Sequence, residues 1–423
     1  MSGRDIVVEI PLLSRVEGRC GLRLEIREGE VSRPVLNIPG PPRFFEKLME
    51  GHDREQVVEM AARIGGHSPV AHQLCAAQAF ERLAGLDPGP WVQAMRRLML
   101  CGEWIQSHSR HIHLMALPDF LGCGHMLGLM AGYREELGRG WRLQSLGRDL
   151  VTLLGGRAVH PVGVRIGGFH RAPGPVEVRA MRERLRDALP EAEALLAWLA
   201  SSLAFPLDEH PFTSVALSPA SGYPMGGTRI QSGDWLDIEA GEFMRHFDRY
   251  EVDRSLAPHS SLDKRPYLVG PLARLNLGFP ELPPPVRQAL GATGIPFPSH
   301  NMFHSILARA VELLWAVQEA LRLVDEYESP ATSFVDVPHA EGISYGTIES
   351  PQGLLWHCYE IDFRRRVNAA WIISPTSQNQ ARMEEDIRLS LERFGLDKDA
   401  AELCRRAGHV IRNYDPCFSC AVH

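Results

Sequence analysis

The chain ends in Asp415-Pro416-Cys417-Phe418-Ser419-Cys420-Ala421-Val422-His423, and this closing stretch decides the fold. Two cysteines separated by two residues can direct two thiolates to one point, which is half of a tetrathiolate metal site. The other half requires a second pair from elsewhere in the chain. The candidate partner segment, residues 63–72, reads RIGGHSPVAH and contains no cysteine. The function therefore depends on whether half of such a site can replace a whole one.

The composition excludes several classes of protein. At 423 residues the chain can bury a large core, and its 44% hydrophobic and 23% charged residues are typical of globular proteins. A net charge of -7 without a long Lys/Arg run argues against nucleic-acid binding. No apolar run reaches the ~20 residues that span a bilayer, and no signal-peptide core follows Met1, so we expect a cytoplasmic location. Apart from the last two, the cysteines are scattered, which favours a reducing compartment over a disulfide framework.

The periodicity of apolar residues predicts an α-rich (α+β) fold, a helical bundle with small peripheral antiparallel sheets. Alternation over residues 6–38 indicates a small antiparallel sheet, and strands are also expected over residues 344–374. Helices are expected over residues 70–86, 91–116, 141–154, 177–204, 302–326, 378–394 and 398–407. We expect a single domain, with an N-terminal β region (1–40), a helical core (41–204), a Gly/Pro-rich insertion of strands and loops (205–300) and a C-terminal part (301–423).

Short motifs occur along the whole chain in a characteristic order. They are Leu13-Ser14-Arg15-Val16-Glu17-Gly18, Pro42 to Leu48, Ala62-Arg63-Ile64, His160-Pro161, Gly167-Gly168-Phe169, Tyr267 to Arg274, Pro375 to Gln380 and the terminal Asp415 to His423. In this order they resemble the large subunit of nickel–iron hydrogenases, in the cytoplasmic, cofactor-coupled branch. The resemblance implies a small iron–sulfur partner subunit and further electron-transfer subunits.

The resemblance also implies which residues would hold the metals. In that family four cysteines bind nickel, and two of them bridge to iron. By position, Cys417 would be a terminal ligand and Cys420 a bridging one, while their N-terminal counterparts are Gly65 and Ser68. Glycine has no ligand atom, and a serine oxygen is a poor substitute for a soft thiolate. The family's arginine above the metal is replaced by Gln352, which carries no charge. These departures argue against an ordinary nickel–iron cluster.

Other residues match the family's site. Glu17 corresponds to a proton-relay glutamate, and Asp415 and Asp119 to carboxylates near the open metal position. Glu46 and His423 correspond to ligands of a magnesium or iron ion that anchors the C-terminus. The chain ends at His423, which fits either a processed end or a gene that no longer needs nickel-triggered cleavage.

Nearby side chains offer alternatives to the lost cysteines. A site of Cys417, Cys420, His67 and Cys75 is one hypothesis, although Cys75 has the pattern of a small core residue. His72, one helical turn from Cys75, matches a histidine that the family packs beside a bridging cysteine. The nearby histidines on the next expected helix resemble metal ligands by type only, and surface or core packing explains them better: His108, His111 and His113.

Three functions remain open at this point. The first is a hydrogenase-like large subunit of a cytoplasmic redox complex that no longer cleaves hydrogen in the usual way. The second is an oxidoreductase with an altered or mononuclear metal centre on Cys417 and Cys420, acting on hydrogen or another small substrate. The third is a scaffold for maturation of the iron–cyanide group. For the cysteine pair itself, a relic in the core or a disulfide is the alternative to a bound metal.

Overall fold

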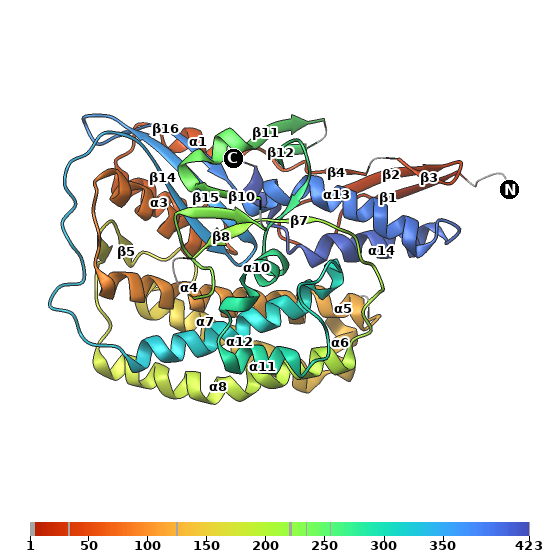
Figure 1. Cartoon of the computed structure of the whole chain (residues 1–423), viewed down its shortest axis with the longest axis horizontal. Helices are drawn as coiled ribbons and strands as arrows, with labels where there is room; N and C mark the ends of the chain where they lie inside the picture. Colours follow the sequence, from red (N-terminus) through yellow and green to blue (C-terminus); the bar gives the residue numbers. More distant parts are fainter. Residues whose placement is uncertain are drawn as a thin grey trace.

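A layer of long helices lies beneath a three-stranded sheet (Figure 1). The computed structural model describes residues 5–32, 34–123, 126–219, 222–233, 235–253 and 255–422. The main helices are α2 (Arg54–Ala61), α3 (Pro69–Leu83), α4 (Pro90–Arg110), α7 (Arg134–Gly155), α8 (Pro175–Ser202), α12 (Ser305–Asp325), α13 (Pro375–Phe394) and α14 (Ala400–Asn413). Shorter helices are α1 (Phe45–Met49), α5 (Leu117–Phe120), α6 (Met126–Gly132), α9 (Phe243–His246), α10 (Pro271–Gly278), α11 (Pro284–Gly291) and α15 (Phe418–Ala421).

The strands form small sheets around this layer. An N-terminal antiparallel sheet contains β1 (Ile6–Ile10), β2 (Gly21–Arg27), β3 (Glu30–Val31) and β4 (Val35–Asn37). The C-terminal sheet has the antiparallel order β14 (Gly342–Ser350), β15 (Gly353–Ile361) and β16 (Val367–Ile373). The remaining strands are β5 (Val164–Arg165), β6 (Gly168–Phe169), β7 (Thr213–Ser214), β8 (Ala216–Ser218), β9 (Arg229–Ser232), β10 (Leu236–Glu239), β11 (Phe247–Val252), β12 (Ser255–Leu262) and β13 (Tyr267–Leu268). This arrangement confirms the predicted α-rich α+β class.

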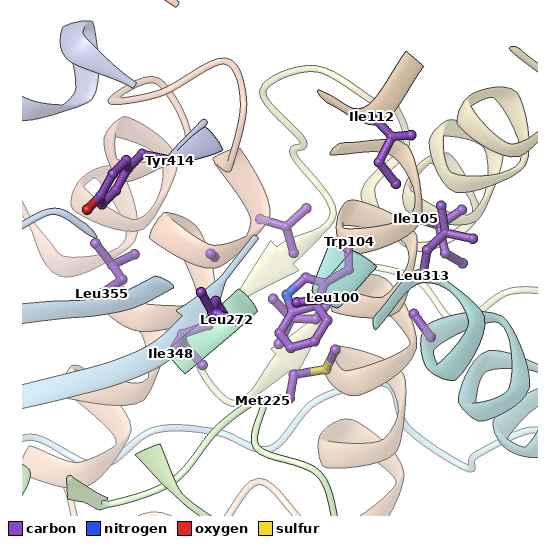
Figure 2. Packing of buried hydrophobic residues seen from close by; sticks show 14 of the residues in the cluster. Leu100, Trp104, Ile105, Ile112, Met225, Leu272, Leu313, Ile348, Leu355 and Tyr414 are labelled. Atoms are coloured by element: carbon purple, nitrogen blue, oxygen red, sulfur yellow. The ribbon is translucent and has the colours of Figure 1, made fainter. Parts of the chain in front are cut away.

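The helical layer is held by one large cluster of buried apolar side chains. Trp104 of α4 is fully buried, and Figure 2 shows it in the same buried cluster as Leu100, Met225, Leu272 and Ile348. Helices α4 and α7 approach closely because glycines face each other: a Cβ on Gly147 would lie 2.6 Å from the carbonyl oxygen of Gly102. This packing fixes α4, whose C-terminal end leads toward the cysteine pair.

Helix α4 continues beyond Arg110 without a break. Residues His111–Ala116 form a π-helical segment, which then leads into α5. The histidines at 108, 111 and 113 are at most 1% exposed. Each contacts a different partner: Glu312 for His108, the carbonyl of residue 412 for His111, and the carbonyl of residue 109 for His113. The expectation of packing for these three histidines is confirmed, in the core rather than on the surface.

The insertion over residues 205–300 contains the expected short strands but also the short helix α9 and the longer helices α10 and α11, where we expected loops. The last two share one feature. Both begin at proline, Pro271 and Pro284, which occupies the first helical turn without loss of a hydrogen bond. The Gly/Pro-rich composition predicts strands and loops, and for these two segments that prediction is wrong. Among the described residues, no helix is both long enough and apolar enough to cross a bilayer.

Candidate functional site

The C-terminal cysteine pair lies inside the protein at the start of α15. Cys417 and Cys420 are each 2% exposed, and their Cα atoms are 5.2 Å apart. Their sulfur atoms are joined as a disulfide. The amide of Cys417 donates a 2.9 Å hydrogen bond to Oγ1 of Thr376, in the first turn of α13. The motif Pro375 to Gln380 therefore positions the cysteine pair.

Gly65 faces the two sulfurs from the opposite side. A Cβ added to Gly65 would overlap Cys420 Sγ and would lie 3.7 Å from Cys417 Sγ. Ser68, three residues later, is buried at the N-terminus of α3, where its side chain makes no capping hydrogen bond. The segment that aligns with the family's first cysteine pair thus lies directly against the second pair.

Glu17 approaches the pair from the N-terminal region. Its carbonyl oxygen accepts a 3.0 Å hydrogen bond from the amide of Phe418, and Oε2 accepts one of 3.1 Å from the amide of Ser419. The Ser419 hydroxyl donates to Oε1 of the same carboxylate. A carboxylate oxygen of Glu17 and the sulfurs of Cys417 and Cys420 all lie within 4.8 Å of one another. Among the described residues this is the one group with metal-ligand proximity, and it offers two sulfurs and one carboxylate.

Gln352 lies beside Asp415 in the buried region behind the pair. Its Nε2 donates to Asp415 Oδ2 at 2.9 Å and to Ser107 Oγ at 3.3 Å. The guanidinium of Arg309, from α12, lies 3.5 Å from the same carboxylate oxygen. Burial raises the pKa of Asp415, but His111 and Arg309 outweigh it and hold the pKa below its ordinary value. The positive charge beside Asp415 is therefore supplied by α12, whereas Gln352 lies in the turn between β14 and β15.

A buried ionic network extends from this region between α10, α12 and β14. Arg274 binds Glu312 through two hydrogen bonds of 2.7 Å and Glu349 through one of 2.8 Å. It also donates to the carbonyls of Ser350 at 2.8 Å and Pro351 at 3.3 Å. All three charged side chains are fully buried. Arg274 therefore holds the turn that presents Gln352.

Two further basic side chains, Arg110 and His67, lie near Asp415. Burial lowers the pKa of Arg110, whereas the nearby Asp415, Glu17 and Glu103 raise it. Burial, aided by Arg110, lowers the pKa of His67 to about 4, so its imidazole is neutral at neutral pH.

The sequence reasoning missed Arg309 and Arg110. The signal for Arg309 was a charged residue within the apolar α12 pattern, three positions before Glu312.

Some of the predicted site residues lie in other interactions. Asp119 forms ion pairs with Arg15 at 2.6 Å and with Arg412 at 2.5 Å, so both its oxygens are occupied. Glu46 accepts hydrogen bonds from Arg249 at 2.9 Å and from the amide of Ile372 at 2.8 Å. His423, the expected second ligand of an anchoring ion, lies outside the described residues.

Two of the alternative ligands near the degenerate segment, His72 and Cys75, contact β15 rather than the cysteine pair. The Nδ1 atom of His72 lies 3.0 Å from Nε2 of His357 on β15. Cys75 is fully buried against the carbonyl of Leu355, and burial raises the pKa of its thiol far above the ordinary value. The structure therefore does not bring Cys75 together with Cys417 and Cys420, which fits its expected role as a core residue.

Comparisons with known proteins identify the family. No family model matches the chain. Sulfhydrogenase 1 subunit alpha of Pyrococcus furiosus is 32% identical over 426 residues, covering 100% of this chain and 99% of that protein. The NAD-reducing hydrogenase HoxS subunit beta of Cupriavidus necator is 26% identical, covering 90% and 87%. The fold matches a crystal structure of an NAD+-reducing [NiFe]-hydrogenase with a TM-score of 0.88 and 24% identity over the full length of both chains. The chain therefore belongs to the family of hydrogenase large (alpha) subunits.

Proposed function

We propose that this chain is the large subunit of a cytoplasmic multi-subunit redox complex that lacks the ordinary four-cysteine nickel–iron site and does not cleave hydrogen in the usual way. The observation that carries the proposal is the position of Gly65, which lies against both sulfurs and has no ligand atom. Ser68 adds only a hard oxygen donor. The residues around the pair do not fit a tetrathiolate nickel centre.

The residues above the pair support the same proposal. Gln352 forms a hydrogen bond with Asp415 but cannot supply the guanidinium that the family places here. Arg309 does carry a guanidinium, but its contacts hold it in place. It donates to the carbonyl of Tyr414 at 3.2 Å and lies within 3.5 Å of the carbonyl of Pro351, the ring of His108 and Asp415. A side chain held by four neighbours is suited to stabilising Asp415 rather than to acting on a substrate.

Electrons would reach this chain through other subunits. The other six cysteines that the structure describes form no disulfide, and they are scattered along the chain at positions 20, 75, 101, 123, 358 and 404. The relatives carry the names of subunits of larger hydrogenases, alpha in one case and beta in another. We therefore infer a small iron–sulfur partner and further electron-transfer subunits, as in the family.

A second candidate function is an oxidoreductase with a single iron or nickel ion at Cys417, Cys420 and Glu17. The proximity of these three ligand atoms favours it. It requires the two sulfurs as separate thiolates and leaves a fourth position for water or substrate. An additional magnesium or iron ion at Glu46 and His423 is part of both proposals, although such an ion would have to compete with Arg249 for the carboxylate.

The experiment is metal analysis of the purified complex together with a hydrogen–deuterium exchange assay. The first function predicts far less than one nickel per chain and no exchange activity. The second predicts about one metal per chain that is lost in a Cys417→Ser/Cys420→Ser variant. One nickel per chain with robust exchange activity would refute the first function. Isolation of the chain without any partner subunit would contradict the assignment to a complex.

A further inference from the structure

The two C-terminal sulfurs are the only pair that is bonded among the cysteines the structure describes. Their Cα separation of 5.2 Å lies within the range of natural disulfides. We propose that Cys417 and Cys420 form a redox-active pair that cycles between a disulfide and two thiols, and that Gly65 provides the space that Cys420 Sγ occupies in the disulfide. The inference rests on the proposed function, because an ordinary nickel site would engage both sulfurs.

The contact at Gly65 indicates that glycine is required for the disulfide, beyond the mere loss of a metal ligand. Because a Cβ at this position would overlap Cys420 Sγ, any other residue would displace the sulfur from its position in the disulfide. The adjacent Gly66 is exposed, and a Cβ there would meet nothing within 4 Å. The steric requirement is therefore specific to residue 65. A cysteine at this position, as in the family, would be incompatible with the conformation that Cys420 adopts here.

The backbone around the pair is held independently of the sulfur–sulfur bond. The amide of Cys417 is bound by Thr376, and the amides of Phe418 and Ser419 are bound by Glu17. The bond can therefore open by rotation of the two side chains while the main chain stays in place. This arrangement suits a pair that must exist in two states.

The chemical step balances as a two-electron, two-proton couple. On reduction the sulfur–sulfur bond breaks, each sulfur gains one electron, and each takes one proton from water to become a thiol. The electrons come one at a time from a reduced iron–sulfur cluster of the partner subunit, and on oxidation they return along the same path.

The test is a redox titration of the two cysteines in the purified complex. Samples are equilibrated in buffers with different ratios of reduced to oxidised dithiothreitol, quenched with acid, alkylated after denaturation and analysed by peptide mass. We expect the C-terminal peptide to change from no label to two labels in a single two-electron transition. Labelling at every ratio in the wild-type protein would overturn the proposal, as would a metal ion bound to the pair under all conditions.

Gly65→Ala and its matched control Gly66→Ala test the steric argument. Gly65→Ala should shift the equilibrium toward the thiols at least tenfold, which corresponds to about 30 mV for a two-electron couple. Gly66→Ala should titrate like the wild type, and an equal shift in both variants would refute the role of Gly65. If Gly65→Ala does not fold, Cys420→Ser serves instead: Cys417 should then be labelled at every ratio. Absence of both nickel and the disulfide would refute this inference alone, whereas a nickel–iron centre would refute the proposed function as well.

Discussion

Replacement of Arg274 by methionine should strongly destabilise the protein, because this arginine is the shared partner of two buried carboxylates. Glu312 and Glu349 are both fully buried and both bind its guanidinium. Methionine fills a similar volume but leaves the two carboxylates without their counter-charge. It also releases the carbonyls of the turn that carries Gln352.

The magnitude follows from two independent estimates. Burial alone would raise the pKa of Glu312, but Arg274 and His108 lower it from its ordinary 4.5 to about 2. At neutral pH this difference corresponds to about 3 kcal/mol of stability. Removal of one partner from a buried ion pair typically costs about 3–5 kcal/mol. We therefore expect the free energy of unfolding to fall by about 3–5 kcal/mol.

Urea unfolding followed by tryptophan fluorescence measures this loss. The guanidinium of Arg274 lies 4.4 Å from the centre of the Trp104 ring, so the fluorescence also reports on the local packing. Arg322→Met is the matched control, since Arg322 also binds two carboxylates but is about half exposed. Arg322→Met should lower the free energy of unfolding by less than about 1 kcal/mol. A loss below about 1 kcal/mol in Arg274→Met would refute the reasoning.

The pH dependence gives a second check of the same variant. In the wild type the contribution of Glu312 is present above pH 4.5 and is lost as the pH falls from 4.5 toward 2. In Arg274→Met burial dominates, so the pKa of Glu312 should rise above its ordinary value. The stability of the variant should then decrease as the pH rises above 4.5. The difference between the two proteins should be larger at pH 8 than at pH 5.

Three further substitutions test the surroundings of the cysteine pair. Glu103 accepts hydrogen bonds from two backbone amides at the start of α3, and Glu103→Gln would place a side-chain NH2 group, itself a donor, against one of them. Urea unfolding should therefore show a free energy of unfolding lower by about 1–3 kcal/mol. Because burial raises the pKa of Glu103 to about 8, the wild type should lose stability between pH 4.5 and 8, and an equal loss in the variant would contradict this. Asp119→Asn weakens the contacts with Arg15 and Arg412 and should lower the free energy of unfolding by about 1–3 kcal/mol. The dithiothreitol titration of the cysteines should not change, and a shifted titration would link Asp119 to the pair. Gln352→Leu removes the 2.9 Å hydrogen bond that Gln352 donates to Asp415, and should lower the free energy of unfolding in urea by about 1–3 kcal/mol. An unchanged unfolding midpoint would show that this hydrogen bond is dispensable.

The overall fold could be predicted because its signals are local. Alternating residues 6–38 specify the N-terminal sheet, and helical periodicity specifies α3, α4, α8 and α12 with errors of a few residues at their ends. The short helices α10 and α11 could not be predicted in the same way. Each is only eight residues long, and its stability comes from packing against distant elements rather than from its own sequence pattern.

The candidate site was predictable only as a set of aligned residues. The sequence indicated that Gly65 and Ser68 replace two ligands, but not that Cys420 Sγ lies where a side chain at residue 65 would begin. It indicated the loss of an arginine at Gln352, but not the approach of Arg309 from a helix 43 positions earlier in the chain (352 − 309). Asp119 was expected near the open metal position, and its two arginine partners come from residues about 100 and 300 positions away. Such contacts depend on the tertiary fold and leave no periodic signal.

Infrared spectroscopy of the purified complex, combined with its nickel content, tests the central claim most directly. Carbon monoxide and cyanide bound to the iron of a nickel–iron centre give bands in a spectral region that is free of protein absorption. We predict that these bands are absent, with far less than one nickel per chain, and that Cys417 and Cys420 are recovered as a disulfide under oxidising conditions. Carbon monoxide and cyanide bands together with one nickel per chain would contradict it.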